Sequence, residues 1–369
     1  MPLARVSSIL GAMAAIALGS GHIATAQSAR PDRPPPPDTI RERISVRPDR
    51  PDSRHATPPR HSRRGALPDV TPAIAATAYH DALARDIIDR ARLARFHQDS
   101  TLTSYDATVK QRLSAGLNVK SIGRDRLIFR SELAARVRWN QSNRVWVDML
   151  GARTAVPPSF GGVKVLKGIT DIVPIPYFSG SERLMWWFNF DGGVNSDDDE
   201  DMFSYVHPLD RGAEAVYEYR SGDSARIQLP GGQEISLREV IVRAREASPD
   251  LIVGSLWFES GGQLVRAAFK PAAPTDMMQV VGEDAFEGVP GPIRATLLTP
   301  YTFEVEAFTI DYGLYGEHWW LPRSQTARGE MRVGPLRSTA TIDQTFRYAS
   351  VNGTDSIPTP TANMRRFGG

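Results

Sequence analysis

The residues best able to do chemistry form an acidic run, Asn195-Ser196-Asp197-Asp198-Asp199-Glu200-Asp201. Carboxylate oxygens are ligands that Ca²⁺ prefers. The run lacks the ligand spacing and central glycine of an EF-hand loop, and consecutive side chains of an extended chain point apart. The run could be a calcium-binding loop or a solvated loop, and the spacing of its carboxylates favours the solvated loop. We therefore predict no metal site.

Catalytic motifs are missing elsewhere in the chain. The four histidines after the N-terminal region, His80, His97, His207 and His318, stand alone, and Glu317-His318 is only half of a zinc-protease motif. No nucleophile elbow, phosphate-binding glycine loop or dinucleotide fingerprint is present. The sequence predicts no catalytic residues, no cofactor and no enzymatic activity. The alternative is an exported hydrolase whose site is assembled from dispersed residues, with His207, His318, Asp197 and Asp311 as candidates.

Bulky apolar residues gather in two neighbouring segments, Ile169–Phe178 and Leu184–Phe188. Pro174 and Pro176 prevent a regular central strand or helix in the first of them. Three uses are open. The segments could line an acyl-chain cavity, place their tryptophans in a membrane interface, or plug one end of a barrel.

The element that must position such a site is a set of strands with a two-residue period. In Leu127–Trp139, apolar side chains alternate with charged ones, which is typical of an antiparallel strand with one wet face. The residues predicted to share the apolar face are Leu127, Phe129, Leu133, Ala135, Val137 and Trp139. Further hairpins are predicted around the glycine-containing turns Ser221–Asp223, Pro230–Gly232 and Ser260–Gly262.

One helix precedes these strands. Thr71 is the predicted N-cap, Pro72 suits the first helical position, and the helix is predicted to end near His97–Ser100. Its predicted buried face contains Ala84, Ile87, Ile88, Ala91 and Ala94. The predicted fold is mainly β with an N-terminal helix (β+α): a large curved antiparallel sheet or half-barrel meander covered by one or two helices.

The N-terminal region predicts export. Residues 1–26 read as a signal peptide, with Arg5 before a short apolar stretch and Ala24-Thr25-Ala26 at the cleavage point. Residues 27–68 contain ten prolines, which predicts a disordered Pro/Arg-rich linker. It could be a basic tether or a solvated spacer. Residues 69–352 are predicted to form a single β-rich envelope domain, and residues 353–369 a disordered tail. The expected location is the periplasm or the outer-membrane surface.

Composition excludes several classes of protein. The chain has no cysteine, which removes lipid-anchor, disulfide and thiolate chemistry. No later segment approaches the ~20 apolar residues of a membrane helix. The linker holds ten Arg against five Asp and Glu, so the basic charge lies there and the rest of the mature chain is mildly acidic. A nucleic-acid-binding domain shows the reverse arrangement, so no nucleic-acid partner is expected.

Scattered motifs resemble a group of uncharacterised bacterial envelope proteins in which a periplasmic β domain precedes an outer-membrane barrel. These motifs, spread over roughly residues 75–352, are Tyr105-Asp106-Ala107, Gly123–Leu127, Arg138-Trp139, Gly151-Ala152-Arg153, Gly254–Phe258, Leu264-Val265-Arg266, Trp320–Arg323 and Phe346-Arg347-Tyr348. The order of helix and meander resembles, more distantly, the half-barrel of outer-membrane lipoprotein carrier and sorting proteins. That resemblance implies a sheet holding acyl chains on its concave apolar side.

The leading functional prediction is a non-enzymatic exported envelope protein. It binds a hydrophobic ligand, such as a lipid or a lipoprotein acyl chain, or an outer-membrane barrel or other envelope partner. A purely structural or interaction module, tethered by residues 27–68, remains a further alternative. The residues predicted to line a ligand site are Phe129, Leu133, Val137, Trp139, Ile172, Ile175, Tyr177, Phe178, Trp186 and Trp187.

Overall fold

The computed structural model describes most of the chain from Leu67 to Gly353. The described residues are 43–44, 67–118, 125–141, 144–155, 173–177, 205–229, 231–276, 299–334 and 336–353. The predicted signal peptide, nearly all of the predicted linker, the acidic run and the predicted tail from residue 354 onward lie outside them.

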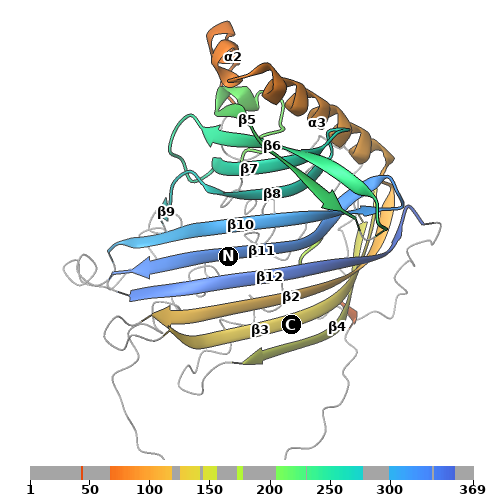
Figure 1. The fold of residues 1–369 in the computed structure, drawn as a ribbon. Helices are drawn as coiled ribbons and strands as arrows, with labels where there is room; N and C mark the ends of the chain where they lie inside the picture. Colours follow the sequence, from red (N-terminus) through yellow and green to blue (C-terminus); the bar gives the residue numbers. More distant parts are fainter. Residues whose placement is uncertain are drawn as a thin grey trace, which may run out of the picture.

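The protein is built around one open antiparallel sheet (Figure 1). Its strands are β1 (Arg43–Ile44), β2 (Ser104–Asn118), β3 (Asp125–Asn140), β4 (Arg144–Ala155), β5 (Tyr217–Gln228), β6 (Glu234–Ala244), β7 (Ile252–Glu259), β8 (Leu264–Pro271), β9 (Thr275–Asp276), β10 (Tyr301–Tyr315), β11 (Trp319–Val333) and β12 (Leu336–Val351). Across the sheet the order is β1-β4-β3-β2-β12-β11-β10-β8-β7-β6-β5, and β9 pairs with β10. The predicted mainly-β class with a large antiparallel sheet is confirmed.

The sheet consists of two meanders rather than one. Strands β2 to β4 form the first, and β5 to β8 with β10 to β12 form the second. They join where β2 pairs with β12, from Asn118 opposite Arg337 to Tyr105 opposite Val351. This pairing joins segments more than 200 residues apart in sequence, which alternation within each strand does not reveal.

Two helices, not one, lie between β1 and β2 in the chain. α2 (Pro72–Ala78) is capped by Thr71, and α3 (Ala82–Thr101) is capped by Asp81, which accepts from the Ala84 amide at 2.8 Å. The predicted single helix is wrong at this point because Tyr79 forms a bridge with Tyr219, and the His80 amide donates to the Tyr219 carbonyl at 2.9 Å. The second oxygen of Asp81 accepts from the Ser221 amide at 2.9 Å, so the same cap fixes α3 to β5.

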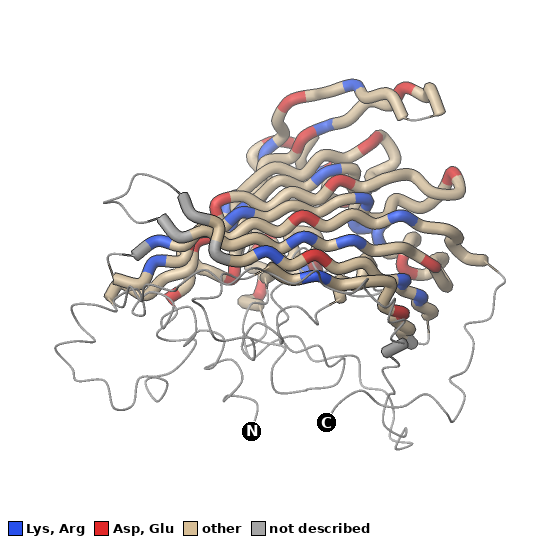
Figure 2. Tube along the Cα trace, turned by 90° about the horizontal axis from the view of Figure 1, so that it is seen from below, with Lys and Arg blue, Asp and Glu red and all other residues tan. Residues whose placement is uncertain are grey.

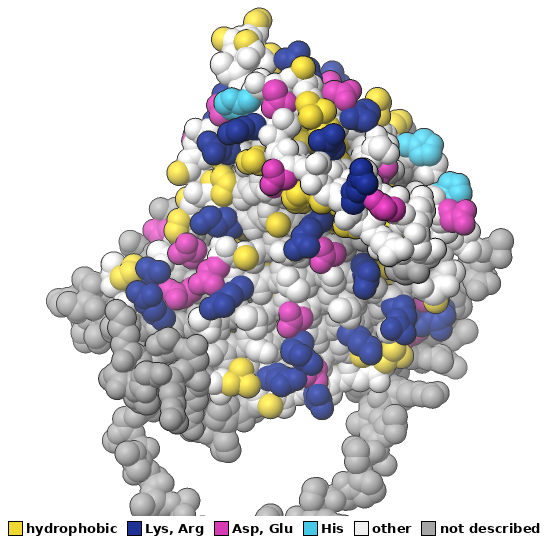
Figure 3. Space-filling view, viewed as in Figure 1, with side chains coloured by type: hydrophobic (Ala, Val, Ile, Leu, Met, Phe, Trp, Pro, Cys, Tyr) yellow, Lys and Arg dark blue, Asp and Glu magenta, His cyan; other side chains and the backbone are white. Residues whose placement is uncertain are grey.

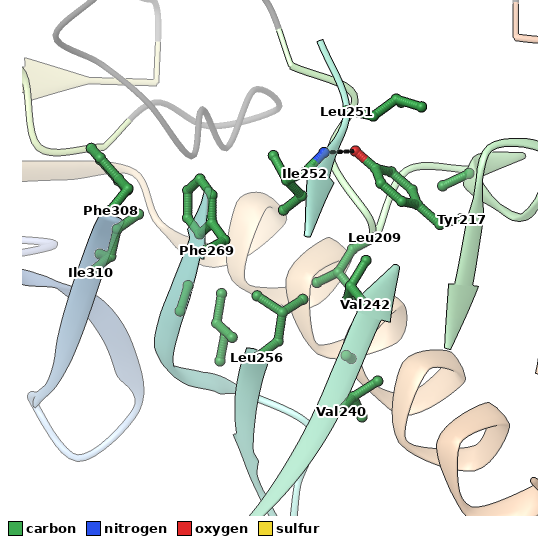
Figure 4. Packing of buried hydrophobic residues seen from close by; sticks show 14 of the residues in the cluster. Leu209, Tyr217, Val240, Val242, Leu251, Ile252, Leu256, Phe269, Phe308 and Ile310 are labelled. Carbon is green, nitrogen blue, oxygen red and sulfur yellow. Dashed lines mark hydrogen bonds between the residues drawn. The ribbon is translucent and has the colours of Figure 1, made fainter. Parts of the chain in front are cut away.

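Two apolar clusters hold these layers together. The larger lies between α3 and the strands from β5 to β12, and Figure 4 shows part of it around Val240, Leu256 and Phe308. The smaller, at the ends of β2 and β3, contains Leu102, Tyr105, Ala107, Val109, Ala135, Val137, Trp139, Val145, Val147, Ile175, Tyr177, Leu321 and Phe346. Within α3, Ala84, Ile87, Ile88 and Ala91 are buried as predicted, and Ala94 is half-buried.

The turn between β7 and β8 sets the distance of α3 from the sheet. Gly262 has φ +91°, and a Cβ at this position would lie 2.7 Å from the carbonyl carbon of Arg90 in α3. The Arg90 guanidinium also donates to the Ser260 carbonyl of the same turn at 2.7 Å. A side chain larger than glycine would therefore meet both backbone strain and the helix.

We expect Gly262→Ala to lower the free energy of unfolding by about 2–4 kcal/mol, measured by urea denaturation. Gly232→Ala is the matched control, because Gly232 has φ +86° in the β5–β6 turn and nothing within 4 Å of its ideal Cβ. It should lose only the cost of backbone strain, about 1 kcal/mol. Equal losses in the two variants would contradict close packing of the turn against α3.

Candidate functional site

The face of the sheet on which α3 packs, which we call the inner face, carries one continuous transverse row of side chains. Residues directly opposite each other in an antiparallel pair point to the same face, so the strand register defines the row. From β6 to β4 it contains Val240, Leu256, Ala267, Ile310, Gln325, Gln344, Gln111, Leu133 and Ala152. Three neighbouring strands therefore contribute glutamine to a row that is otherwise apolar.

Two members of this glutamine row (Gln111, Gln344 and Gln325) are buried, and Gln111 is half-buried. Gln344 is 1% exposed and Gln325 is 3% exposed. The Gln344 side-chain amide donates to the Gln111 carbonyl oxygen at 2.7 Å. The Oε1 atoms of Gln344 and Gln325 are also buried, and neither has a hydrogen-bond donor. Leaving a buried acceptor unsatisfied costs about 1–3 kcal/mol, so two such oxygens side by side destabilise the folded protein substantially.

Apolar rows lie on both sides of the glutamine row. One contains Phe269, Phe308, Ala327, Ile342 and Leu113, and the other includes Phe346, Val109, Ala135 and Met149. The polar row is thus a band across an apolar surface. An amphiphile offers the matching chemistry, since its body removes apolar surface from water and its polar group can donate to the oxygens.

An aromatic cluster (Tyr105, Trp139, Tyr177, Tyr315 and Tyr348) occupies the inner face near the ends of β2, β3 and β12. The ring of Tyr105 stacks on Trp139 with centroids 5.4 Å apart, and it meets Tyr348 edge-on at 5.6 Å. Burial raises the pKa of both tyrosines far above the ordinary value. The Trp139 Nε1 and Tyr348 hydroxyl are buried and make no hydrogen bond. Unsatisfied polar atoms therefore occur at a second place on the inner face.

Residues 173–177 lie against this cluster. The Tyr105 hydroxyl donates to the Tyr177 carbonyl at 2.8 Å, and the Tyr177 hydroxyl donates to Asp99 of α3. The segment is therefore tied both to the sheet and to the helix. Its prolines, Pro174 and Pro176, are buried without forming a strand, as the sequence predicted.

The structure describes six of the ten residues predicted to line the site, and it brings them together at the inner face of the sheet. Phe129, Leu133, Val137 and Trp139 are buried on the inner face of β3, and Ile175 and Tyr177 pack with the last two of these in the smaller cluster. The other four, Ile172, Phe178, Trp186 and Trp187, lie outside the described residues. The sequence analysis did not predict the glutamine row, although the two-residue alternation along β2 puts Gln111 on the same face as Val109 and Leu113.

Leu127 is the one described residue of the predicted apolar face that lies elsewhere. It is 55% exposed. The register shifts between Ala115 and Gly116, so that Phe129 faces Ala115 while Leu127 faces Gly116. This β-bulge reverses the alternation for the first residues of β3. The prediction for Leu127 was therefore wrong because a strict two-residue period does not include bulges.

The opposite, outer face is charged. Figure 2 shows Lys, Arg, Asp and Glu along the strands, and Figure 3 shows both signs interspersed on the surface. An open hollow there is lined by residues that include Lys110, Arg112, Glu132, Arg153 and Asp343. Glu132 accepts from Arg112 at 3.2 Å, from Arg130 at 2.9 Å, and from Arg153. These cations neutralise the carboxylate, so the charged side chains that line the hollow form an ion-pair network.

The carboxyl of Glu132 is expected to titrate at unusually low pH. Hydrogen bonds from Arg130 and Arg153 lower its pKa from 4.5 to about 2. Because the folded-state pKa is depressed, the stabilisation by this network is complete above about pH 4.5 and is lost as the pH falls towards 2. A carboxyl-carbon NMR titration should show this, and Arg153→Ala should raise the value. A midpoint for Glu132 near 4.5 in the native protein would contradict the network.

Of the residues weighed for catalysis, Asp197 lies outside the described residues, and the other three lie in separate environments. The buried His207 Nδ1 accepts from the Leu209 amide at 2.9 Å, and burial lowers the pKa of His207 well below its ordinary value. His318 lies in the β10–β11 turn, next to the Gly316 carbonyl, and Asp311 lies 3.6 Å from Arg266. Among the described residues, no three His, Asp or Glu side chains gather closely enough to hold a metal ion.

No helix in the described part of the chain is long and apolar enough to cross a membrane.

Comparisons with known proteins give distant similarities in structure alone. No family model and no curated protein matches the chain. The chain is similar to an outer membrane lipoprotein-sorting protein domain from Vibrio parahaemolyticus, at 11% identity and a TM-score of 0.24, over 72% of this chain and 94% of that one. It is also similar to lipovitellin, from a structure of lipid–protein interactions, at 7% identity and a TM-score of 0.23, over 70% of this chain but only 26% of that one.

The first of these is the kind of protein that the more distant sequence resemblance named. The resemblance to envelope proteins with a following barrel stays a prediction.

Proposed function

We propose that this protein is a non-enzymatic, exported carrier that holds an amphiphile against the inner face of its sheet. The amphiphile has an acyl-type apolar body and a hydrogen-bond donor in its polar group. The observation that carries this proposal is the pair of buried, donorless oxygens on Gln344 and Gln325, set between apolar rows. A donor from the ligand removes their desolvation cost, and the flanking rows bury the ligand's hydrocarbon.

Three further features support this function. The sheet is open, with β1 on β4 at one end and β5 at the other, so its inner face is not sealed by strand pairing. The aromatic cluster supplies further unsatisfied polar atoms, on Trp139 and Tyr348, at a second position on the same face. The N-terminal pattern around Arg5 and Ala24-Thr25-Ala26 supports export to the envelope, where acyl-bearing molecules must cross an aqueous space.

The test is a binding titration with a fluorescent fatty acid on protein freed of lipid. We expect saturable uptake. A fatty alcohol should then displace the probe about tenfold more effectively than the methyl ether of the same alcohol, because the ether has no donor for the glutamine oxygens and one hydrogen bond is worth about 1 kcal/mol or more. Non-saturable uptake would refute the carrier function. Saturable uptake with equal displacement by alcohol and ether would refute the role of the glutamine row.

A further inference from the structure

The outer face of the sheet carries a local excess of positive charge over β12, β2, β3 and β4. Residues directly opposite each other in an antiparallel pair share a face, so the register groups the charged side chains of these strands. This basic surface contains the cations Lys110, Arg112, Arg130, Arg136, Arg138, Arg153 and Arg347 and the carboxylates Asp106, Glu132, Asp148 and Asp343. In Figure 3, dark blue side chains prevail over the lower part of the face in view, where these strands lie.

The carboxylates of the basic surface do not neutralise all of its cations. Glu132 is shared by three arginines, whose combined charge exceeds its own. Asp106 and Asp148 each accept from one arginine, at 2.9 Å and 2.7 Å. Lys110 and Arg347 are exposed, and neither forms an ion pair within the described part of the chain. These two cations are therefore available to an anion from outside the protein.

Lys110 lies at the open hollow in this surface, which has a volume of about 580 Å³. The floor of the hollow is made of small residues, because Lys110 faces Ala134 in β3 and Ala134 faces Gly151 in β4. These small residues leave room beside Lys110 and Arg153, which both line the hollow. Ammonium and guanidinium groups bind phosphate oxygens, so the hollow suits the phosphate of a lipid headgroup.

Two exposed leucines lie on the same strands as the basic surface. Leu127, which the bulge at Ala115 and Gly116 turns away from the inner face, is 55% exposed. Leu150 lies at the bulge of β4, is 56% exposed, and precedes Gly151 of the hollow. Cations beside exposed leucines match the interface of a bilayer, where cations meet anionic headgroups and leucines enter the acyl boundary. A nucleic acid would bind the cations but leave the leucines in water.

We propose that the basic surface docks this protein onto an anionic lipid bilayer. Lys110 and Arg347 bind headgroup phosphates, and Leu127 and Leu150 enter the interface. Cations near an anionic bilayer each add to the affinity, and salt screens their contribution. This inference goes beyond the carrier function and does not depend on it, because the basic surface lies on the face of the sheet opposite the glutamine row.

The test is cosedimentation of the full chain with vesicles of phosphatidylcholine, alone or mixed with phosphatidylglycerol. We expect binding to the mixed vesicles only, and Lys110→Gln with Arg347→Gln should weaken it about tenfold or more. The matched control, Arg220→Gln with Lys270→Gln, removes the same charge from exposed positions on β5 and β8 and should bind as the native protein does. All variants keep the N-terminal tract, so its arginines contribute equally. Equal affinities of the two double variants, or equal binding to both kinds of vesicle, would overturn the proposal.

A second measurement locates the contact directly. Because the chain has no cysteine, a polarity-sensitive fluorophore can be attached at Leu150→Cys or, as a control, at Leu93→Cys in α3, where Leu93 is 70% exposed. Since α3 packs against the inner face, we expect only the Leu150 label to shift to shorter wavelength on the mixed vesicles. A shift of the Leu93 label alone, or of neither label, would contradict docking through the basic surface.

Two competitors test the other occupants of this surface. Inorganic phosphate at constant ionic strength and poly-glutamate should both leave the protein bound to the mixed vesicles. Release by phosphate would assign the hollow to a free anion, and release by poly-glutamate would assign the surface to an acidic protein. Either result would overturn the proposal.

Discussion

Replacing Trp139 with alanine is expected to lower the free energy of unfolding by about 3–5 kcal/mol, the range for deletion of a fully buried large aromatic side chain. Trp139 is 0% exposed and stacks on Tyr105. Its loss opens a cavity at the point where β2, β3, α3 and residues 173–177 meet, because Tyr105 also holds the Tyr177 carbonyl. Urea denaturation followed by circular dichroism measures the change.

The control for this prediction is Trp257→Ala. Trp257 lies on the outer face of β7, is half-buried, and faces Arg266 and Glu239 across the neighbouring strands. Its removal should cost about 2 kcal/mol, less than that of Trp139, because it packs only partly against the larger cluster and no closed cavity forms. Trp139→Phe, which retains a ring, should recover part of the loss. A smaller loss for Trp139→Ala than for Trp257→Ala would contradict the placement of the aromatic cluster.

The double change Gln325→Leu with Gln344→Leu is expected to stabilise the protein and weaken ligand binding together. It removes two buried acceptors without donors, so the free energy of unfolding should rise by about 1–3 kcal/mol even though Gln111 loses the amide of Gln344. The affinity for a fatty alcohol should fall about tenfold, because the ligand's donor no longer has an acceptor. Denaturation and competition binding measure the two effects on the same samples.

Gln141→Leu is the control for the general effect of adding a leucine. Gln141 is exposed in the turn after β3 and is not part of the glutamine row. It should change neither ligand affinity nor stability beyond about 0.5 kcal/mol. A double variant that is destabilised, or that binds the alcohol as well as the native protein does, would show that the glutamine row serves the core rather than a ligand.

The sequence predicted the local features of the fold well. Alternation identified the strand over Leu127–Trp139, observed as β3, and the hairpins around Pro230–Gly232 and Ser260–Gly262. The hairpin predicted around Ser221–Asp223 is wrong, because these residues lie within β5, where the pairing with β6 shifts register between Ser221 and Ser224. The cap at Thr71 was confirmed, whereas the break before Asp81 was not foreseen. Each success depends on neighbours in sequence. The break depends on β5, which binds Tyr79 and Asp81 from about 140 residues away.

The candidate site was only half predictable for the same reason. The inner face of β3 followed from alternation, since Phe129, Leu133, Val137 and Trp139 share parity. The glutamine row did not, because Gln111, Gln325 and Gln344 meet only through the pairing of β2 with β12 and of β12 with β11. A single buried glutamine on one strand does not indicate a binding site. The register shows that three glutamines are neighbours in one row, and that arrangement indicates a site.

The most direct test is to observe the glutamine side chains themselves during binding. With ¹⁵N-glutamine labelling, the side-chain amide signals of Gln111, Gln325 and Gln344 are assigned by substitution and followed as a fatty alcohol is added. We predict that these three signals shift saturably, in step with displacement of the fluorescent probe, while that of exposed Gln141 stays in place. Displacement of the probe with the three signals unmoved would contradict an amphiphile held at the glutamine row.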